Sequence, residues 1–482
     1  MRPLCLSNGS TVFQTTTKRE YWGKWFIAGV GLRMIGAPVT GRADKQRNGR
    51  RQILSWQRKL RLGKLRECHG TIIGRRGDKK KDEMIAVEKI PMTKRFWIVF
   101  LSGLLATYLW LDGVHLFYKP ALSYVFEELA VPAKAKVMAK THLRMWQDTA
   151  QRKQILAAMR RSNAEWDFMG RTFLVLSLCE MSLREPSLTQ ENLKVVDTII
   201  DETIRLEKGH GMYFFLMPYA KAKPFVAQPA RSLFIESEIA LMMAARQMVE
   251  RRPEYDGILM ERIDAMVGRL QSSPRHVMES YPDECWLFDH SMALAAIKIS
   301  DYLDGRDHGA FCRQWLEEAK QTFMDQQTGL LISSFSERRE AMDGPEGSSI
   351  WLATHCLRLV DEKFAQEQYN LAKQHLARQL CGFAWSREWP VNSRGHLDID
   401  SGAVIPILDV SPGGSGLAFI AAASFGDRDY LQQLHTTLDF AAFPTREEGA
   451  LRYSASNQVG DSVMLYSMVL GPMWKLVKKG NK

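Results

Sequence analysis

The stretch from Ser280 to Ser291, SYPDECWLFDHS, gathers several groups capable of acid/base chemistry directly ahead of an apolar helical segment. Asp289 follows Cys285 by four residues, so the two side chains share one face of a helix. A carboxylate in an apolar helix is costly unless it is paired or functional, and burial raises its pKa toward the range of a general acid. We therefore predict that Asp289 is catalytic. The alternative is a structural carboxylate bonded to a loop amide or to an arginine such as Arg231.

Three further acids are catalytic or binding candidates. Glu238 lies in the apolar stretch SLFIESEIALMM, where the same argument applies. Asp398 and Asp400 alternate in HLDIDSG, so an extended segment points them to opposite faces, and we place Asp400 in catalysis and Asp398 in substrate binding. Asp283 is a fourth catalytic candidate, although its position favours an N-cap for a helix that begins at Glu284.

Aromatic residues and one cysteine complete the predicted substrate-binding set, for which packing in the core is the alternative. Its members, besides Asp398, are Tyr281, Cys285, Trp286, Trp351 and Tyr453. No histidine is placed by the sequence to activate Cys285 as a nucleophile. The seven cysteines show neither a C-x-x-C motif nor zinc-site spacing, so no metal site is predicted.

The net charge of +11 is unevenly distributed along the 482 residues. Residues 1–95 hold 23 Lys and Arg against 7 Asp and Glu, whereas the rest of the chain holds 42 against 47. The body is thus mildly acidic, which argues against a nucleic-acid partner. Residues 1–91 lack helical or strand periodicity and predict a disordered basic arm; translated sequence upstream of a later start is the alternative.

An apolar segment follows the arm. As a helix, residues 96–118 would span about 34 Å, enough to cross the hydrocarbon core of a bilayer. Basic residues cluster on its N-terminal side, so the positive-inside rule predicts a single-pass protein of the inner, cytoplasmic membrane with its C-terminal domain outside the cytoplasm. A cleaved signal peptide and a buried core helix are the alternatives, and the lack of an A-x-A site favours the uncleaved form.

From about residue 150 two kinds of helical segment alternate. Five amphipathic segments, 191–208, 256–271, 311–324, 364–380 and 429–442, have the pattern of surface helices. Six segments are apolar nearly all round, as buried helices are: 168–183, 232–249, 286–300, 349–360, 413–425 and 462–474. With an outer helix near 150–161 this makes six outer–inner hairpins, which bury their apolar helices by closing into a ring.

The predicted fold is therefore all-α, an (α/α)6 toroid preceded by one N-terminal transmembrane helix. An open solenoid is the alternative. The predicted organisation is a basic arm (1–91), a transmembrane anchor (92–120), an amphipathic connector (121–149) and the toroid domain (150–482). Parallel inner helices would bring their N-terminal ends, and the acids there, to one axial cavity.

These segments resemble the linalool dehydratase/isomerase family over roughly residues 150–475. The resemblance is carried by YPDECW and the sequence after it (281–331), SSIWLATHCLRLVD (348–361), the Gly-rich stretch 398–427 and LRY (451–453). It implies an (α/α)6 fold, a location outside the cytoplasm, no cofactor and the option of a homo-oligomer. It also implies loss and addition of water at an alcohol carbon, with allylic isomerisation.

The sequence departs from the family pattern at three catalytic positions. Ser280 and Asp289 stand where the family has cysteines, and Glu238 stands where it has a histidine. We therefore expect carboxylate acid/base chemistry of the lyase or dehydratase/isomerase type on a hydroxylated substrate. Because of these departures the family's terpenoid alcohol does not carry over as the substrate, so a terpenoid is one option and the substrate stays open. A glycan-acting hydrolase or lyase on the same fold is one alternative. A non-catalytic scaffold of the cell envelope is the other.

Overall fold

The computed structural model describes residues 91–273, 275–393 and 402–480. The chain divides into two units, Met1–Lys89 and Ile90–Lys482, and the description concerns the second. The predicted basic arm therefore lies outside the described residues except for its last residue, and so do Asp398 and Asp400. The described part is mostly helical, which confirms the all-α class.

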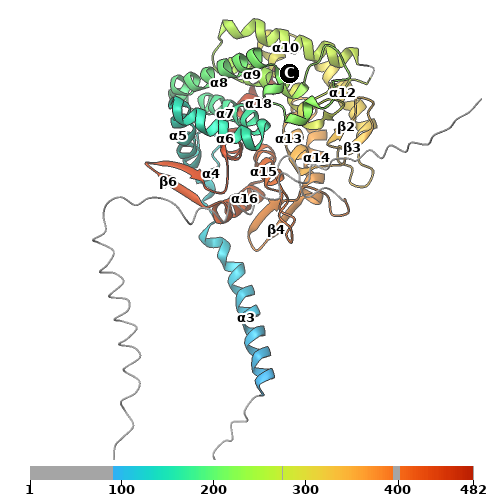
Figure 1. Ribbon diagram of the computed structural model, residues 1–482. Helices are drawn as coiled ribbons and strands as arrows, with labels where there is room; N and C mark the ends of the chain where they lie inside the picture. The colour runs from blue at the N-terminus through green and yellow to red at the C-terminus, as the bar shows by residue number, and fades with distance from the viewer. Residues whose placement is uncertain (1–90, 274, 394–401, 481–482) are drawn as a thin grey trace, which may run out of the picture. The chain divides into compact units, whose positions relative to one another are not determined.

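In the described part of the chain, six apolar helices form the centre of the body; α7, α9, α13 and α15 are labelled in Figure 1. Each contacts the next along the chain, and the last contacts the first, so that they close into a ring. Most of their residues are buried, because each helix packs between two ring neighbours and lies inside the outer helices. They are α7 (Ala164–Arg184), α9 (Leu233–Val249), α11 (Leu287–Asp304), α13 (Gly347–Leu357), α15 (Pro412–Ser424) and α17 (Gln458–Val469).

Amphipathic helices alternate with the ring helices along the chain and cover them from outside (Figure 1). They are α6 (Thr149–Ser162), α8 (Thr189–His210), α10 (Pro253–Ser272), α12 (Gly309–Thr322), α14 (Glu362–His375) and α16 (Arg428–Ala441). The segment predicted as a connector holds α4 (Leu122–Val125) and α5 (Ala133–Gln147), and α5 packs against α17. The last helix, α18 (Pro472–Gly480), contacts both α7 and α11.

Hydrogen bonds at both ends of the ring show that neighbouring inner helices run in the same direction. At the starting ends, the Glu388 carboxylate accepts hydrogen bonds from Ser348 in α13 and from Ser411, the N-cap of α15. At the opposite end, His355 of α13 bonds to Ser424 of α15 and to Tyr466 of α17. The N-terminal ends of these inner helices therefore lie on one face of the ring.

Three small antiparallel sheets occupy the loops that lead into inner helices. The first pairs β1 (Cys285–Trp286), β2 (Ser334–Phe335) and β3 (Ala341–Asp343), with Cys285 opposite Phe335. The others are hairpins, one of β4 (Ala377–Leu380) with β5 (Phe383–Ser386) and one of β6 (Pro444–Glu447) with β7 (Ala450–Tyr453). Short 3-10 turns complete the element order: η2 (His115–Phe117), η3 (Pro186–Leu188), η4 (Met212–Phe214) and η5 (Pro218–Lys221).

These strands and turns correct three predicted boundaries. No helix begins at Glu284, because β1 pairs with β2 there and α11 starts only at Leu287, so Asp283 is not its N-cap. The outer segment predicted over 364–380 ends as a helix at His375 and continues as β4. The inner segment predicted over 462–474 is divided by Gly471, whose φ of 126° cannot continue a helix, so α17 and α18 are separate.

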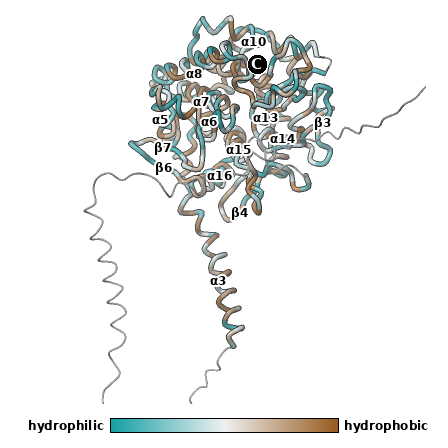
Figure 2. Tube along the Cα trace, in the orientation of Figure 1, coloured by the Kyte–Doolittle hydropathy of each residue, from teal (hydrophilic) through white to brown (hydrophobic). Residues whose placement is uncertain are grey.

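The helix α3 (Met92–Val114) precedes the ring, and Figure 2 shows it as largely hydrophobic. Together with η2 it gives an apolar span over Met92–Phe117, none of which is buried. An apolar N-terminal helix is therefore present where the sequence predicts one, and it is not a core helix of the described body.

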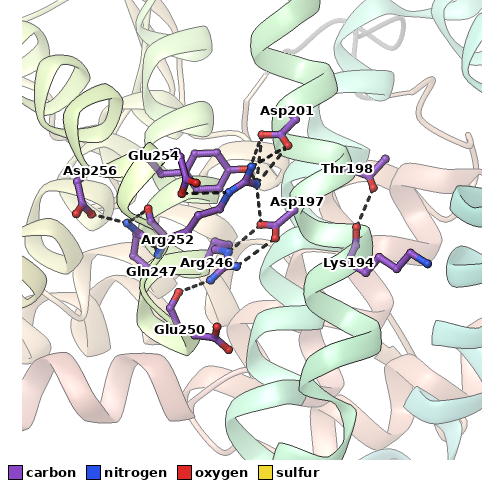
Figure 3. A network of polar contacts seen from close by, with 11 residues as sticks. Lys194, Asp197, Thr198, Asp201, Arg246, Gln247, Glu250, Arg252, Glu254 and Asp256 are labelled. Atoms are coloured by element: carbon purple, nitrogen blue, oxygen red, sulfur yellow. Dashed lines mark hydrogen bonds and ion pairs between the residues drawn. The ribbon is translucent and has the colours of Figure 1, made fainter.

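Paired charges fix the outer helix α8 to the end of the ring helix α9 (Figure 3). The Arg246 guanidinium donates two hydrogen bonds to the Asp197 carboxylate, with Nε to Oδ1 at 2.8 Å and Nη2 to Oδ2 at 3.1 Å. Arg252 reaches Asp201 in the same way, at 3.2 Å from Nη1 to Oδ2. Bidentate pairs of this kind set the orientation of one helix against the other.

Candidate functional site

Two buried carboxylates on neighbouring ring helices form the centre of the candidate site. Glu238 lies in the second turn of α9 and Asp289 in the first turn of α11. Glu238 is 0% exposed and Asp289 is 4% exposed. The starts of α9 and α11 lie side by side, and the charge of Asp289 acts on Glu238, so the structure places the two acids near each other.

Burial shifts the protonation of both acids. Desolvation raises the pKa of Asp289 to about 7. It also raises the pKa of Glu238 well above its usual value, and the like charge of Asp289 adds to that rise. The Thr172 hydroxyl of α7 donates to Glu238 Oε2 at 2.6 Å and opposes the rise, whereas Glu238 Oε1 has no hydrogen-bond partner. Near neutral pH the pair therefore holds a proton, and Oε1 is the oxygen free to use it.

The Ser280 hydroxyl lies beside Asp289 and lowers the pKa of that carboxyl slightly against the effect of burial. It does not reach the geometry of a hydrogen bond and is buried without a partner. Ser280 occupies its place because the Ser232 hydroxyl donates to its carbonyl at 2.6 Å, which ties the loop before α11 to the start of α9. The two helices that carry the acids are thus held together by the loop that carries Ser280.

Glu279 holds this loop in position. Its carboxylate accepts three backbone hydrogen bonds, from Val226 at 2.9 Å, Ala227 at 2.8 Å and Asp283 at 2.6 Å. The residue is 2% exposed, so its charge is balanced by amides and not by water. One buried side chain therefore connects the loop 225–229 to the loop that leads into α11.

Tyr281, predicted to line the substrate site, lies next to the acid pair and is buried. Its hydroxyl donates to Glu165 near the start of α7 and accepts from the backbone amide of Met217 at 2.9 Å. Its ring stacks on Tyr219 with centroids 4.8 Å apart. The charge of Glu165 also raises the pKa of Glu238, so the Tyr281–Glu165 contact is electrostatically part of the same site.

The remaining residues of the SYPDECWLFDHS stretch serve packing. Cys285 is buried as a free thiol, and desolvation raises its pKa well above the usual value, followed by the effect of nearby carboxylates. Trp286 is half-buried and offers its carbonyl to His290 Nδ1 at 2.8 Å. His290 points to the outer layer and stacks on Trp315 of α12 at 5.4 Å. Burial lowers the pKa of His290 to about 4, which keeps it neutral.

Three other predicted residues, Asp283, Trp351 and Tyr453, have structural contacts of their own. Asp283 has a φ of 53° and accepts a hydrogen bond from the Glu337 amide at 3.2 Å, as a turn residue. Trp351 packs against Tyr369 and Tyr430 of the outer helices, and its indole donates to Ser386. The Tyr453 hydroxyl donates to Asp439 of α16, at 2.6 Å from Oδ1. Asp398 and Asp400 lie outside the described residues.

Sequence reasoning missed two buried acids on the same face of the ring. Glu388 binds the starts of α13 and α15 together, and burial raises its pKa. Asp461 in the first turn of α17 has a pKa raised to about 7 by burial, and its Oδ1 has no hydrogen-bond partner. Glu388 stands two residues before Pro390, outside any helical pattern, so periodicity offered no signal for it. Asp461 resembles an ordinary first-turn acid in the sequence.

Within the described ranges no group of three His, Cys, Asp or Glu side chains has the arrangement to hold a metal ion. The cysteines of the described ranges are free thiols: Cys179 and Cys356 in ring helices, Cys312 in the outer helix α12, and Cys285 and Cys381 in the loops and strands between helices. Carboxyl groups such as Glu238 and Asp289 can transfer protons.

Comparison with known proteins gives a family match and remote structural likenesses. Residues 282–459 match the family model for linalool dehydratase/isomerase. A search of curated proteins returned no match. An alpha-amylase from Clostridium perfringens superposes with a TM-score of 0.37 at 11% identity, over 62% of this chain and 85% of that one. A family 105 glycoside hydrolase from C. acetobutylicum gives 0.33 at 12%, over 69% and 99%.

The family match begins inside the SYPDECWLFDHS stretch and includes the helices α11 to α16 and both hairpins. It leaves out the part of the chain that carries Glu238, Thr172 and Glu165. The resemblance seen in the sequence is confirmed over residues 282–459, the part of the chain that matches the linalool dehydratase/isomerase family model.

Proposed function

We propose that this protein is a membrane-anchored enzyme whose (α/α)6 toroid removes water from, or adds water to, a hydroxylated small molecule by carboxylate acid/base chemistry. The observation that carries the proposal is the pair of acids Glu238 and Asp289, which are buried on adjacent ring helices, with Glu238 Oε1 lacking a hydrogen-bond partner and both pKa values raised by burial. Perturbed pKa values of this kind are typical of catalytic acids and bases. No cofactor enters the proposed reaction.

In the proposed reaction Glu238 is the acid. Its protonated Oε1 donates to the substrate hydroxyl, the C–O bond breaks, and water leaves with that proton. Asp289, ionised in part near neutral pH, accepts a proton from the neighbouring carbon, and the C–H electron pair forms the new double bond. The pair ends with its proton on Asp289, and transfer back to Glu238 restores the starting state. Hydration follows the same steps in reverse.

The electrostatics of the pair suit this division of roles. Two adjacent buried carboxyls do not ionise together readily, because like charges in a desolvated site raise each other's pKa. The negative charges of Asp289 and Glu165 both raise the pKa of Glu238. Asp289 lies in the first turn of α11, where the helix dipole favours the ionised form. The acid and base roles therefore fall on Glu238 and Asp289 respectively.

The proposed placement in the cell follows from α3 and its flanks. The apolar span Met92–Phe117 is long enough to cross a bilayer, and Lys94 and Arg95 stand at its start. By the positive-inside rule the N-terminus would face the cytoplasm and the ring the other side. Supporting this, the chain after the span runs directly into the body, where the Gln432 amide donates to the Pro120 carbonyl at 2.9 Å.

The experiment uses the full-length protein in detergent, incubated with terpenoid alcohols in isotopically labelled water. Reversible loss and addition of water places labelled oxygen in the recovered alcohol, which mass spectrometry detects. We expect Glu238→Gln and Asp289→Asn each to lower the exchange rate at least about 100-fold, as loss of a general acid or base does.

The matched control is Glu180→Gln, at the far end of the ring. Glu180 is also a buried acid with a pKa raised to about 7, and its carboxylate accepts from the amides of Gly471 and Met473. This variant should keep the exchange rate. Unchanged exchange in the Glu238 and Asp289 variants would refute the acid/base assignment. Turnover of envelope glycans without any exchange would instead identify a glycan-acting enzyme.

A further inference from the structure

The end of the apolar span contacts the ring body directly. The His115 ring packs directly on Gly382 in the β4–β5 turn, where any Cβ would collide with it. It also meets Phe383 edge-on with centroids 6.4 Å apart. Tyr118 meets Phe440 of α16 in the same manner at 5.1 Å. Because these contacts begin within the span itself, no flexible linker separates the span from the body.

Large apolar side chains are exposed on the elements that make this joint. Leu380 of β4 is 49% exposed, Phe440 at the end of α16 is 47% exposed, and Phe443 just beyond it is 65% exposed. We call these three residues the joint rim. Phe440 contacts Phe383 at 5.2 Å, so β5 and α16 form one continuous surface beside the end of the span.

The depth of the joint rim follows from the length of the span. Phe96 to Phe117 measures about 33 Å as a helix, which matches a hydrocarbon core of about 30 Å. Phe117 therefore reaches the far interface of the bilayer, and Tyr118 stands at headgroup level. Since Tyr118 contacts Phe440, the joint rim lies at the same level. Aromatic side chains at that depth are favoured there.

We propose that the joint rim inserts into the interfacial layer of the bilayer, so that the ring body rests on the lipid surface. The proposal depends on the proposed membrane span, because the joint alone sets the depth of the rim. Exposed phenylalanines are then buried among lipid headgroups and not left in water. Lys119, exposed between the span and the body, has the position of an interfacial cation.

Photo-cross-linking tests the proposal on the full-length protein in vesicles of phosphatidylcholine and phosphatidylglycerol. The photoreactive amino acid p-benzoylphenylalanine replaces Phe443 in one sample and Met260 in another. Met260 is 41% exposed on α10, which packs on α9 and α11, opposite the α15 sector that α16 covers (Figure 1). A third sample carries the same amino acid in place of Leu104, within α3.

We expect irradiation to attach phospholipid at positions 443 and 104 and none at position 260, as read by mass spectrometry. Attachment at 104 without attachment at 443 would overturn the joint-rim proposal and leave the membrane span intact. No attachment at 104 would refute the span, and the joint-rim proposal would fall with it. A cross-link from 443 to a second copy of the chain would replace the lipid surface by a protein interface.

Discussion

Replacing Asp289 by asparagine should remove the contribution of this one buried carboxyl to the pH dependence of the free energy of unfolding. Asp289 titrates at about 7 in the folded protein against 3.8 as its ordinary value. A raised pKa means that the folded state binds the proton more tightly, so the stabilisation is complete below pH about 4 and is lost as the pH rises through about 7. The difference of about three pKa units corresponds to about 4 kcal/mol.

The assay is urea unfolding of the full-length protein in detergent at pH 4 and at pH 8. Asparagine has nearly the same shape and does not titrate. The free energy of unfolding of Asp289→Asn should therefore rise relative to the original protein by about 4 kcal/mol between the two pH values. His142 and His290, whose pKa values burial lowers to about 4, titrate in both proteins and cancel in this comparison.

The control is Asp429→Asn, at an exposed aspartate of α16, which removes one negative charge without opening a buried site. A difference between Asp289→Asn and the original protein that stays constant from pH 4 to pH 8 would refute the desolvation argument. The double variant with Glu238→Gln adds a second check. Each single substitution removes the same repulsion between the two acids, so their gains at pH 8 should sum to more than the gain of the double variant.

Three further predictions concern the framework of the site. Gly347→Ala should destabilise the ring by about 2 kcal/mol because its Cβ would stand 2.5 Å from the Arg387 carbonyl, whereas Gly344→Ala meets nothing within 4 Å and should not; thermal unfolding compares them. Glu279→Gln should cost about 3 kcal/mol in urea unfolding, since a neutral amide accepts three backbone donors poorly. Thr172→Val removes the hydrogen bond that lowers the pKa of Glu238, so the alkaline limb of a pH–rate profile should move to higher pH, with Thr172→Ser unchanged.

The helices of the ring were largely predictable because burial leaves a local trace in the sequence. A helix surrounded by protein is apolar on all sides, and a covering helix is apolar on one. The predicted inner segment 232–249 and the observed α9, Leu233–Val249, differ by one residue for this reason. The first four ring helices are likewise apolar on all sides, and this pattern can be seen in each segment without knowing which helices pack against it.

The boundary errors have a different origin, because they depend on contacts between distant residues. The start of α11 is delayed to Leu287 by the pairing of Cys285 with Phe335, fifty residues along the chain. The strand β4 replaces the end of a predicted helix because the turn at Cys381 and Gly382 has positive φ at both residues and returns the chain onto it. The break at Gly471–Pro472 is the one boundary that the local sequence signals. The apolar pattern on both sides of it nevertheless favoured a single continuous helix.

The two acids of the site could be predicted from the sequence, but the residues that contact them or act on their pKa values could not. Glu238 and Asp289 were identifiable because a carboxylate inside an apolar helix contradicts its surroundings. Thr172 and Glu165 come from α7, the ring neighbour, and nothing in their own stretch of sequence distinguishes them. Glu236, two residues before Glu238, has the opposite fate: it accepts hydrogen bonds from Arg231 and Arg262 on the outside of the ring.

The resemblance implies other residues at Ser280, Glu238 and Asp289, of which only Asp289 lies within the matched residues 282–459. The charge of Asp289 acts on Glu238 and the Ser280 hydroxyl acts on Asp289, so the three belong to one site. A buried thiol keeps its proton at neutral pH because desolvation raises its pKa, as it does at Cys285. A buried carboxyl also keeps a proton, but with a pKa of about 7 at Asp289 it can release and recover that proton near neutral pH. Serine at position 280 removes the thiol that would compete for the proton. Under the proposed function, Glu238 and Asp289 are a pair of groups suited to passing one proton back and forth, as reversible loss of water requires.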